Sequence, residues 1–421
     1  MNKSNIYTKH ILSNGIRVIC EKVEGVRSVS VGIWAGAGSR FETKANNGVS
    51  HFLEHMLFKG TRTRSAKQIA EEIDAIGGQI NAFTGKECTC YYTKTLDERL
   101  DVGIDILSDI ILNSKLAMRD ISVERNVILE EINMYEDSPE DLVHDLLTTQ
   151  MWGKSTLGMP VLGTGESLNS IDKACLKEYI SQKYVPANIV ISVAGSFDEA
   201  GLVKMLDKKF AKLKSNNTFP PVADKPRFCK GAYVKQKDTE QIHICIGMKG
   251  IETGHDDIYT LNLINYIFGG GMSSILFQKI REELGLVYSI YSYGSAFKHA
   301  GQFVIYAGMN PEQFERVYSL IWDELKKFKA AGLDEDSLHK AKEQFRGNYL
   351  LSLEGSMGRM SSLGKSELLL GRVHTPEEIL NKVDRISLKA ANELINRIIS
   401  EKNYAVAAVG KVDNAFFNRV E

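Results

Sequence analysis

The hydrophobic residues of this chain fall into short alternating runs and longer helical periods. A hairpin is predicted around the Asn-Gly pair at 14–15, because short apolar runs flank it on both sides. A buried strand is predicted at 29–34 and a helix at 47–58. A second helix is predicted from Ser65, a favourable N-cap residue, to the Gly-Gly stop signal at 77–78. Strands and helices are therefore mixed from the first part of the chain.

The same mixture continues downstream. Two further strands are predicted at 79–84 and 89–94. Two further helices are predicted at 100–113 and from 120 or 122 to about 135. Meandering strands combined with long helices are typical of the α+β class, with a mostly antiparallel sheet flanked by helices.

An internal repeat is visible in this pattern. The segment NIVISVAGSFD at 188–198 resembles NYAVAAVGKVD at 403–413, and the two align without a gap. Upstream of each copy, SLNSID ending at Asp172 resembles ILNKVD ending at Asp384. Each of these segments is followed by a helical pattern and then by the repeated strand, which predicts two halves of similar topology.

The boundary between the halves is marked by composition. The stretch 214–226 is rich in Asn, Pro and polar residues and shows no period. We therefore expect two homologous α/β-sandwich-like halves at 1–213 and 229–421, joined by a linker at 214–228.

Composition and charge argue against a nucleic-acid-binding or membrane protein. Of 421 residues, 43% are hydrophobic and 25% are charged, as in soluble globular proteins. The net charge of −1 gives no field that would attract nucleic acid or an anionic membrane. The first residues, MNKSNIYTKH, lack the apolar core of a secretion signal, and no apolar run approaches the roughly 20 residues of a membrane span. We expect a cytoplasmic protein with neither nucleic acid nor membrane as a partner.

Cysteine and glycine usage argues against two further classes of site. The six cysteines are scattered without a CxxC pair, which favours reduced, packed thiols. The glycine run at 269–271 precedes a helix that Ser273 or Ser274 is expected to cap. It lacks the Gly-Lys-Ser/Thr ending of a phosphate loop, so nucleotide binding has little support.

The first candidate functional residues lie in the segment HFLEH. It places His51, Glu54 and His55 at positions i, i+3 and i+4. On a helix these three side chains share one face. Two neutral imidazoles from consecutive turns can occupy adjacent corners of a zinc tetrahedron, and the glutamate between them can take a proton from bound water. The alternative is a partly exposed helix face that holds two histidines by chance.

A catalytic zinc needs a third protein ligand, and the helix ISVERNVILEEINMYE offers carboxylates for it. Glu124 and Glu131 are seven residues apart and share a face, whereas Glu130 points elsewhere. One of the two can bind zinc while the other hydrogen-bonds a ligating histidine. Spacing alone does not decide between the adjacent glutamates, so Glu130 stays open as a third ligand, and a solvated acidic stripe is the plain alternative.

The two motifs together resemble a known family. HFLEH followed by MLFKG, with VILEEI downstream, closely resembles the insulinase and pitrilysin superfamily of zinc peptidases with the inverted HxxEH motif. Within it, the chain looks like the branch that contains the β-subunit of mitochondrial processing peptidase and its bacterial relatives. The resemblance implies His51, His55 and Glu131 as ligands of one zinc ion per chain, Glu54 as general base and Glu124 as a supporting carboxylate.

The resemblance also implies residues that bind the substrate. In the catalytic half, 1–213, Asn81, Ala82 and Phe83 would form an edge strand beside the zinc, to which an extended peptide adds through main-chain hydrogen bonds. In the half 229–421, Arg281 and Tyr288 match a pair that the family uses to bind the substrate backbone and stabilise the developing oxyanion. Without the resemblance, these residues read as an ordinary hairpin, a surface arginine and a sheet tyrosine.

The expected function is a zinc-dependent endopeptidase that hydrolyses oligopeptides or unfolded presequence-like segments in a closed chamber. Two-domain chains of the family pair, so we expect a homodimer, and the sequence leaves open whether Arg281 and Tyr288 act in the same chain or in the partner. A noncatalytic assembly subunit of the same fold is the main alternative. A zinc-storage protein would not account for Glu54. The histidines His144 and His243 are expected to be isolated, in structural or solvated positions.

Overall fold

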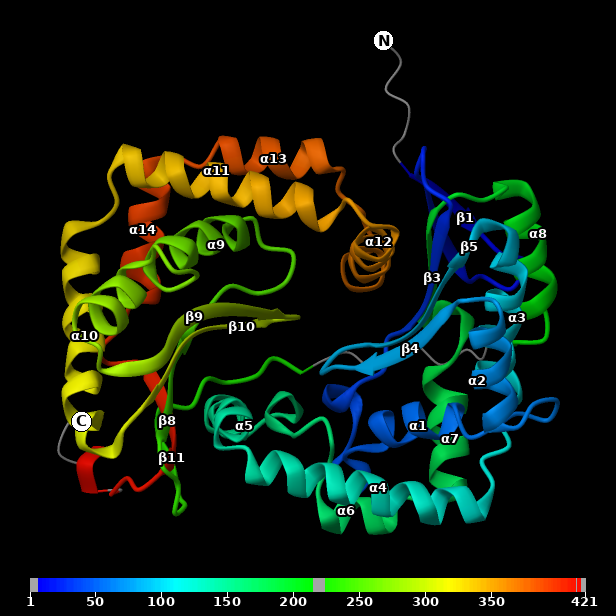
Figure 1. Ribbon diagram of the computed structural model, residues 1–421, viewed down its shortest axis with the longest axis horizontal. Coiled ribbons are helices and arrows are strands. Elements are labelled where there is room, and N and C mark those ends of the chain that lie inside the picture. Colours follow the sequence, from blue (N-terminus) through cyan, green and yellow to red (C-terminus); the bar gives the residue numbers. More distant parts are fainter. Residues whose placement is uncertain (1–6, 215–223, 414, 418–421) are drawn as a thin grey trace. The chain divides into compact units, whose positions relative to one another are not determined.

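The computed structural model describes residues 7–214, 224–413 and 415–417 (Figure 1). The chain divides into two compact units, each built around one β-sheet. Unit 1 comprises Met1–Ile132, Met159–Val222 and Leu350–Thr375. Unit 2 comprises the remaining segments, Asn133–Gly158, Ala223–Tyr349 and Pro376–Glu421.

Unit 1 contains a six-stranded sheet with the strand order β1-β2-β6-β3-β5-β4. Strand β2 runs parallel to β6, and all other neighbours in this sheet are antiparallel. Strand β4 is the last strand of the order, so one of its edges has no neighbour among the described strands. The strands are β1 Thr8–Ile11, β2 Arg17–Lys22, β3 Ser28–Ala35, β4 Gln79–Thr84, β5 Thr89–Leu96 and β6 Ile189–Gly195.

Both faces of this sheet are covered. In β6, Ile189, Ile191 and Val193 face the main core with α1, α3, α7 and α8, whereas Val190 and Ala194 face α12. A strand with two covered faces needs apolar residues at nearly every position, which is why β6 reads as a continuous hydrophobic run. The helices of unit 1 include α1 Val49–Leu57, α2 Ala66–Ala75, α3 Leu100–Asn113, α6 Gly165–Ser170, α7 Lys173–Lys183, α8 Glu199–Phe210 and α12 Ser356–Leu370; α4 Met118–Asp137 continues past the unit boundary.

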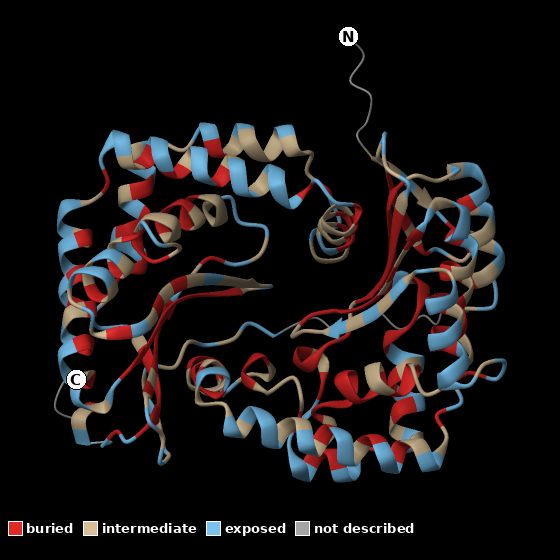
Figure 2. Cartoon of the chain, in the orientation of Figure 1, coloured by how far each residue is buried: buried red, intermediate tan, exposed pale blue. Residues whose placement is uncertain are grey.

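Unit 2 contains a five-stranded sheet with the equivalent order β7-β11-β8-β10-β9. Strand β7 runs parallel to β11, and the other pairs are antiparallel. One face packs on the main core of the unit and the other on α5. Figure 2 shows the many buried residues of these strands in red. The elements are β7 Gly231–Gln236, β8 Ile242–Lys249, β9 Val287–Phe297, β10 Ala300–Met309 and β11 Tyr404–Gly410, with α5 Pro139–Trp152, α9 Asp257–Phe268, α10 Phe314–Ala331, α11 Glu335–Ser352, α13 Pro376–Asp384 and α14 Leu388–Ile398.

The repeat in the sequence is a repeat of structure. Strand β11 begins one residue after the start of its sequence copy, just as β6 does in the first copy, and helix α14 precedes β11 as α7 precedes β6. Both repeated strands lie between one parallel and one antiparallel neighbour in their sheets. The expected α+β class with two similar halves is therefore confirmed.

Each half of the chain gives one helix to the other compact unit. Helix α12 packs on β3 and β6 of unit 1, and α5 packs on β8 and β11 of unit 2. The compact units therefore differ from the predicted halves 1–213 and 229–421 in these two segments. Hydrophobic periodicity shows that a helix has a buried face but not which sheet it covers. Most of the predicted linker, 214–228, lies outside the described residues.

Most predicted elements lie where the pattern placed them. Helix α2 begins after Ser65, whose hydroxyl accepts a hydrogen bond from the Gln68 amide at 3.2 Å. Helix α4 begins at Met118, slightly earlier than the pattern indicated. The predicted cap at Ser274 is not formed, because its hydroxyl is buried without a hydrogen-bond partner among the described residues.

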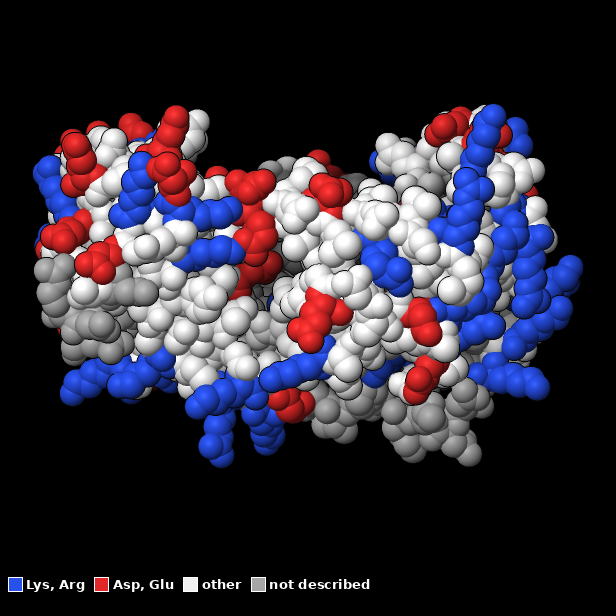
Figure 3. All heavy atoms as spheres, turned by 90° about the horizontal axis from the view of Figure 1, so that it is seen from below, with Lys and Arg blue, Asp and Glu red and all other residues white. Residues whose placement is uncertain are grey.

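Charge and hydropathy add two observations. No helix among the described residues is long and apolar enough to cross a membrane. On the face drawn in Figure 3, both basic and acidic side chains are present, and the sequence as a whole has 52 basic and 53 acidic residues.

Helix α12 approaches the sheet of unit 1 closely because two glycines leave room for it. A Cβ atom at Gly364 would lie 2.0 Å from Nε1 of Trp34, and one at Gly32 would lie 2.3 Å from Sδ of Met360. The Trp34 indole has little freedom to move, since it is buried and donates a hydrogen bond to Ser192 Oγ at 2.8 Å. Helix and sheet therefore fit in one arrangement.

Buried carboxylates hold α12 in that arrangement. Glu367 on α12 pairs with Lys9 at 2.7 Å and with Arg17 at 3.1 Å. Near the start of the helix, Arg359 pairs with the buried Glu21 of β2. Removing one partner of a buried pair leaves an uncompensated charge, so these contacts specify the position of the helix.

The substitution Gly364→Ala should destabilise the protein by about 1–3 kcal/mol, because the added methyl group would overlap the Trp34 indole. Gly347→Ala is the matched control, since it lies inside α11 and an added Cβ there meets no atom within 4 Å. Helix propensity should make that variant about 0.5–1 kcal/mol more stable. Urea unfolding measures both changes, and a Gly364→Ala protein as stable as wild type would contradict the close packing of α12.

Candidate metal centre

The start of helix α1 is held by Glu42, a buried carboxylate that no motif in the sequence indicates. Glu42 accepts hydrogen bonds from the amides of Gly48 at 2.7 Å and Ser50 at 2.8 Å, and from the Asn47 side chain at 2.9 Å. A negative charge at a helix N-terminus is favourable. Burial raises the pKa of Glu42, and the hydrogen bonds from Ser50, Asn47 and Gly48 lower it. Sequence spacing carries no signal for this contact, because Glu42 is separated from α1 by a loop.

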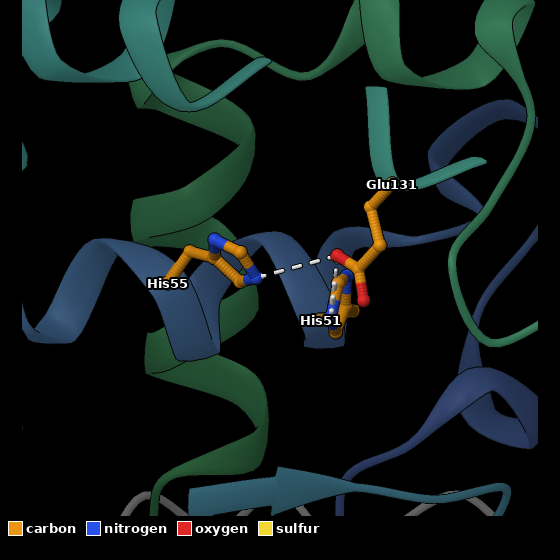
Figure 4. Close-up of side chains that lie close together, drawn as sticks. All are labelled: His51, His55 and Glu131. Carbon is orange, nitrogen blue, oxygen red and sulfur yellow. Dashed lines mark ion pairs between the residues drawn. The ribbon is translucent and has the colours of Figure 1, made fainter. Parts of the chain in front are cut away.

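Helices α1 and α4 bring His51, His55 and Glu131 together (Figure 4). Oε2 of Glu131 lies 3.6 Å from Nε2 of His51 and 3.7 Å from Nε2 of His55. One ligand atom from each residue lies within 4.8 Å of the others. Within the described residues, this is the one group of three or more His, Cys, Asp or Glu side chains with such spacing.

The geometry fits a zinc ion. Nitrogen and oxygen ligands at about 2.0–2.2 Å from zinc are about 3.3–3.6 Å apart in a tetrahedral site, close to the separations from Glu131. Burial and the neighbouring His55 lower the pKa of His51 to about 4, so its imidazole is neutral at neutral pH, as a metal ligand must be. His55 and Glu131 are partly exposed, which leaves room for a further ligand.

Glu124 lies behind His55 and fixes its orientation. Its Oε2 is 3.1 Å from Nδ1 of His55, and its Oε1 is 2.8 Å from Nζ of Lys59. Because a carboxylate can only accept a hydrogen bond, Nδ1 of His55 carries a proton, and in the neutral imidazole Nε2 then has a free lone pair on the side of Glu131. By contrast, Nδ1 of the buried His51 has no hydrogen-bond partner among the described residues.

Glu54 lies on the same helix, next to His55 in sequence, and is half-buried. Its Oε2 accepts a hydrogen bond from the hydroxyl of Thr84, the last residue of β4. Burial raises the pKa of Glu54, and the nearby Glu131 raises it further, while Thr84 and His55 lower it. A raised carboxyl pKa suits a group that accepts and returns a proton near neutral pH.

Glu130 lies apart from this group. Its side chain is outside the ligand group, whereas Glu131 is within it. The geometry therefore favours Glu131 as the third ligand.

Asn81, Ala82 and Phe83 lie on the edge strand β4 of unit 1. Asn81 and Phe83 are exposed, and the Phe83 ring packs edge-on against Trp34 with centroids 5.6 Å apart. Ala82 points to the opposite face and packs against the core. Strand β4 contacts α1, the helix that carries His51 and His55.

Arg281 and Tyr288 lie in unit 2, around one cavity of about 490 Å³. The guanidinium of Arg281 lies over the Phe277 ring, 4.6 Å from its centroid, and both belong to a π-helical segment, Phe277–Glu283. Tyr288 near the start of β9 is 77% exposed. Both side chains line the same cavity in their own unit.

His144 and His243 occupy structural positions, as expected, but they are not isolated. His144 on α5 makes hydrogen bonds with the hydroxyls of Tyr293 at 2.8 Å and Tyr291 at 3.1 Å. His243 on β8 makes one with Tyr306 at 2.8 Å. Nothing in their spacing along the chain indicates this cluster, because its members come from α5 and from three strands of unit 2.

Comparison with known proteins agrees with these motifs. Residues 17–165 match the insulinase domain of peptidase family M16, and residues 170–345 match the domain described as the peptidase M16 inactive domain. The protein named uncharacterized zinc protease YmxG, from Bacillus subtilis (strain 168), is 43% identical over 406 residues, which cover 96% of this chain and 98% of that protein.

Solved structures show the same fold. A protease from Helicobacter pylori superposes with a TM-score of 0.90 at 20% identity, covering 96% of this chain and 99% of that chain. A chain of complex III2 from Candida albicans superposes with a TM-score of 0.85 at 20% identity, covering 99% of both chains. By its domains and its relatives, this chain belongs to peptidase family M16, the insulinase family of zinc proteases.

Proposed function

We propose that this chain is an active zinc-dependent endopeptidase that hydrolyses oligopeptides or unfolded segments. The observation that carries the proposal is the convergence of His51, His55 and Glu131, with Glu54 beside them on α1. A site that only stored metal would not need a half-buried carboxylate next to the ligands.

Each residue of the candidate site would have a separate role in peptide hydrolysis. His51, His55 and Glu131 would hold one zinc ion per chain. When bound, zinc lowers the pKa of a water ligand and polarises a carbonyl group. Glu54 accepts the proton of the attacking water and passes it to the amine that leaves. Glu124 keeps the His55 imidazole in the tautomer that leaves Nε2 free.

The edge strand β4 accounts for the proposed substrate class. A peptide that adds to a strand edge binds through its main chain, so it must be extended and makes few demands on side chains. Residues Asn81, Ala82 and Phe83 would form this subsite, and folded proteins would be excluded. Arg281 and Tyr288 carry a guanidinium and a phenol, which are hydrogen-bond donors of the kind that stabilise a developing oxyanion.

The substitution Glu54→Gln tests the proposal, because it keeps the size of the side chain and removes its basicity. Turnover of a quenched peptide library should fall by at least about 100-fold, while zinc content stays at one ion per chain. Unchanged turnover in the Glu54→Gln protein would reject the mechanism.

The second candidate function is a noncatalytic assembly subunit. The similarity in fold to a chain of the Candida albicans complex III2 favours it. The two functions predict different results for the wild-type protein. A protein that binds zinc but cleaves no unfolded peptide would fit the subunit role. The complete ligand group with Glu54 favours the enzyme.

The zinc affinity of three carboxylate variants tests the assignment of the ligands. Glu124→Gln should weaken zinc binding about 10- to 100-fold through the loss of support for His55. Glu131→Gln should weaken it further, and Glu130→Gln, at the neighbouring position outside the ligand group, should leave it unchanged. Competition with a chromophoric chelator measures all three. A larger effect at Glu130 than at Glu131 would overturn the assignment.

We also propose that two chains form a homodimer around a closed chamber and that the protein acts in the cytoplasm. The family resemblance supports the dimer. The six cysteines support the location, because all are free thiols, as is usual in a reducing compartment. Fractionation of cells tests the location.

Sedimentation of the purified protein should show twice the mass of one chain. A single-chain mass at concentrations where peptides are cleaved would contradict the dimer. Mixing Glu54→Gln and Arg281→Met chains then locates the action of Arg281. Recovered activity requires that Arg281 of one chain serves the zinc site of the other, and dimers without recovered activity require that it serves its own chain.

A further inference from the structure

Two threonine hydroxyls lie close together on the strands next to Glu54. The Thr84 hydroxyl donates to Glu54 Oε2 and lies 3.3 Å from the Thr89 hydroxyl. Thr89 is fully buried and donates its own proton to the main-chain carbonyl of Ala37 at 3.0 Å, so neither hydroxyl has a proton left for the other. The donor to Glu54 is held instead by the pairing of Thr84 with Thr89 in the β4–β5 ladder, which fixes the main chain that carries the hydroxyl.

The position of Thr84 connects two parts of the site. It is the last residue of β4 and pairs with Thr89 of β5 in the antiparallel register. Residues alternate between the faces of a strand, so Thr84 shares the face of Ala82, which packs toward the core, while Phe83 points to the other face. One residue thus belongs to the edge strand and also contacts the candidate base.

A hydrogen bond at this point selects one orientation of Glu54. A glutamate has three rotatable bonds, and here its carboxylate lies near another carboxylate, that of Glu131, which would repel it. A fixed hydroxyl donor offsets that repulsion and holds one carboxylate oxygen, which also fixes the direction of the other. Misplacement of a catalytic group by about 1 Å can cost roughly 100-fold in rate.

We propose that Thr84 is the positioning residue of Glu54, and that its hydroxyl ties the base to the strand that receives the peptide. The inference rests on the proposed peptidase function. A peptide that adds to the edge of β4 pairs with the same strand that orients the base. Strand β4 would thereby position both the bound peptide and the carboxylate of Glu54.

The test compares Thr84→Val, which removes the hydroxyl, with Thr84→Ser, which keeps it. With a quenched peptide, kcat of Thr84→Val should fall roughly 10- to 100-fold while KM and zinc content stay within about twofold of wild type. Thr84→Ser should restore kcat to within a few-fold of wild type. Thr95→Val is the matched control, because it removes a buried hydroxyl near the far end of β5, away from Thr89 and Glu54.

Two kinetic results would overturn the proposal. One is a Thr84→Val protein with the kcat of the Thr95→Val control, and the other is a change in KM alone. Crystal structures of the zinc-loaded proteins give a readout that does not need activity: Glu54 should keep one orientation in wild type and Thr84→Ser and leave it in Thr84→Val. An unmoved Glu54 in Thr84→Val would sink the inference, whereas a wild type without turnover would sink the proposed function instead.

Discussion

Three ligand atoms from two helices must approach within a few ångströms for this site to work, and that requirement constrains much of unit 1. Two imidazoles and a carboxylate that are held close together and half-buried lose hydration, which costs free energy. Hydrogen bonds from neighbouring residues must therefore hold them in place. Glu42 fixes the start of α1, and Glu124, itself paired with Lys59, fixes His55. Glu42 thus fixes one end of α1, and the Glu124 contacts join α4 to the other end, so that the position of Glu54 relative to the candidate ligands is set.

The duplicated fold gives this chain two similar frameworks and one ligand group. Helix α11 precedes α12, the helix that packs on the other unit, as α4 precedes α5. Among the described residues, the candidate ligand group of unit 1 has no counterpart in unit 2. The second framework instead carries Arg281 and Tyr288 around its cavity.

Local signals in the sequence were enough for most elements and for the candidate ligands, except for the choice between Glu130 and Glu131. Helical spacing placed His51, Glu54 and His55 on one face, and the spacing of Glu124 and Glu131 predicted a second face that could meet it. Contacts between separate elements could not be predicted in this way.

Glu42 lies before α1 and bonds the amide of Gly48, and Thr84 lies at the end of an edge strand and bonds Glu54. In neither case do the two residues belong to one periodic pattern. The exchange of α5 and α12 was also missed, because an amphipathic pattern does not identify the surface that it covers.

The measurement that bears most directly on the site is a crystal structure of the zinc-loaded protein with anomalous data collected at the zinc absorption edge. We expect one anomalous peak in unit 1, bound by Nε2 of His51, Nε2 of His55 and a carboxylate oxygen of Glu131, with Glu54 close by but not a ligand. A peak without Glu131 in its coordination, or no peak at this group in a protein that cleaves peptides, would contradict the account.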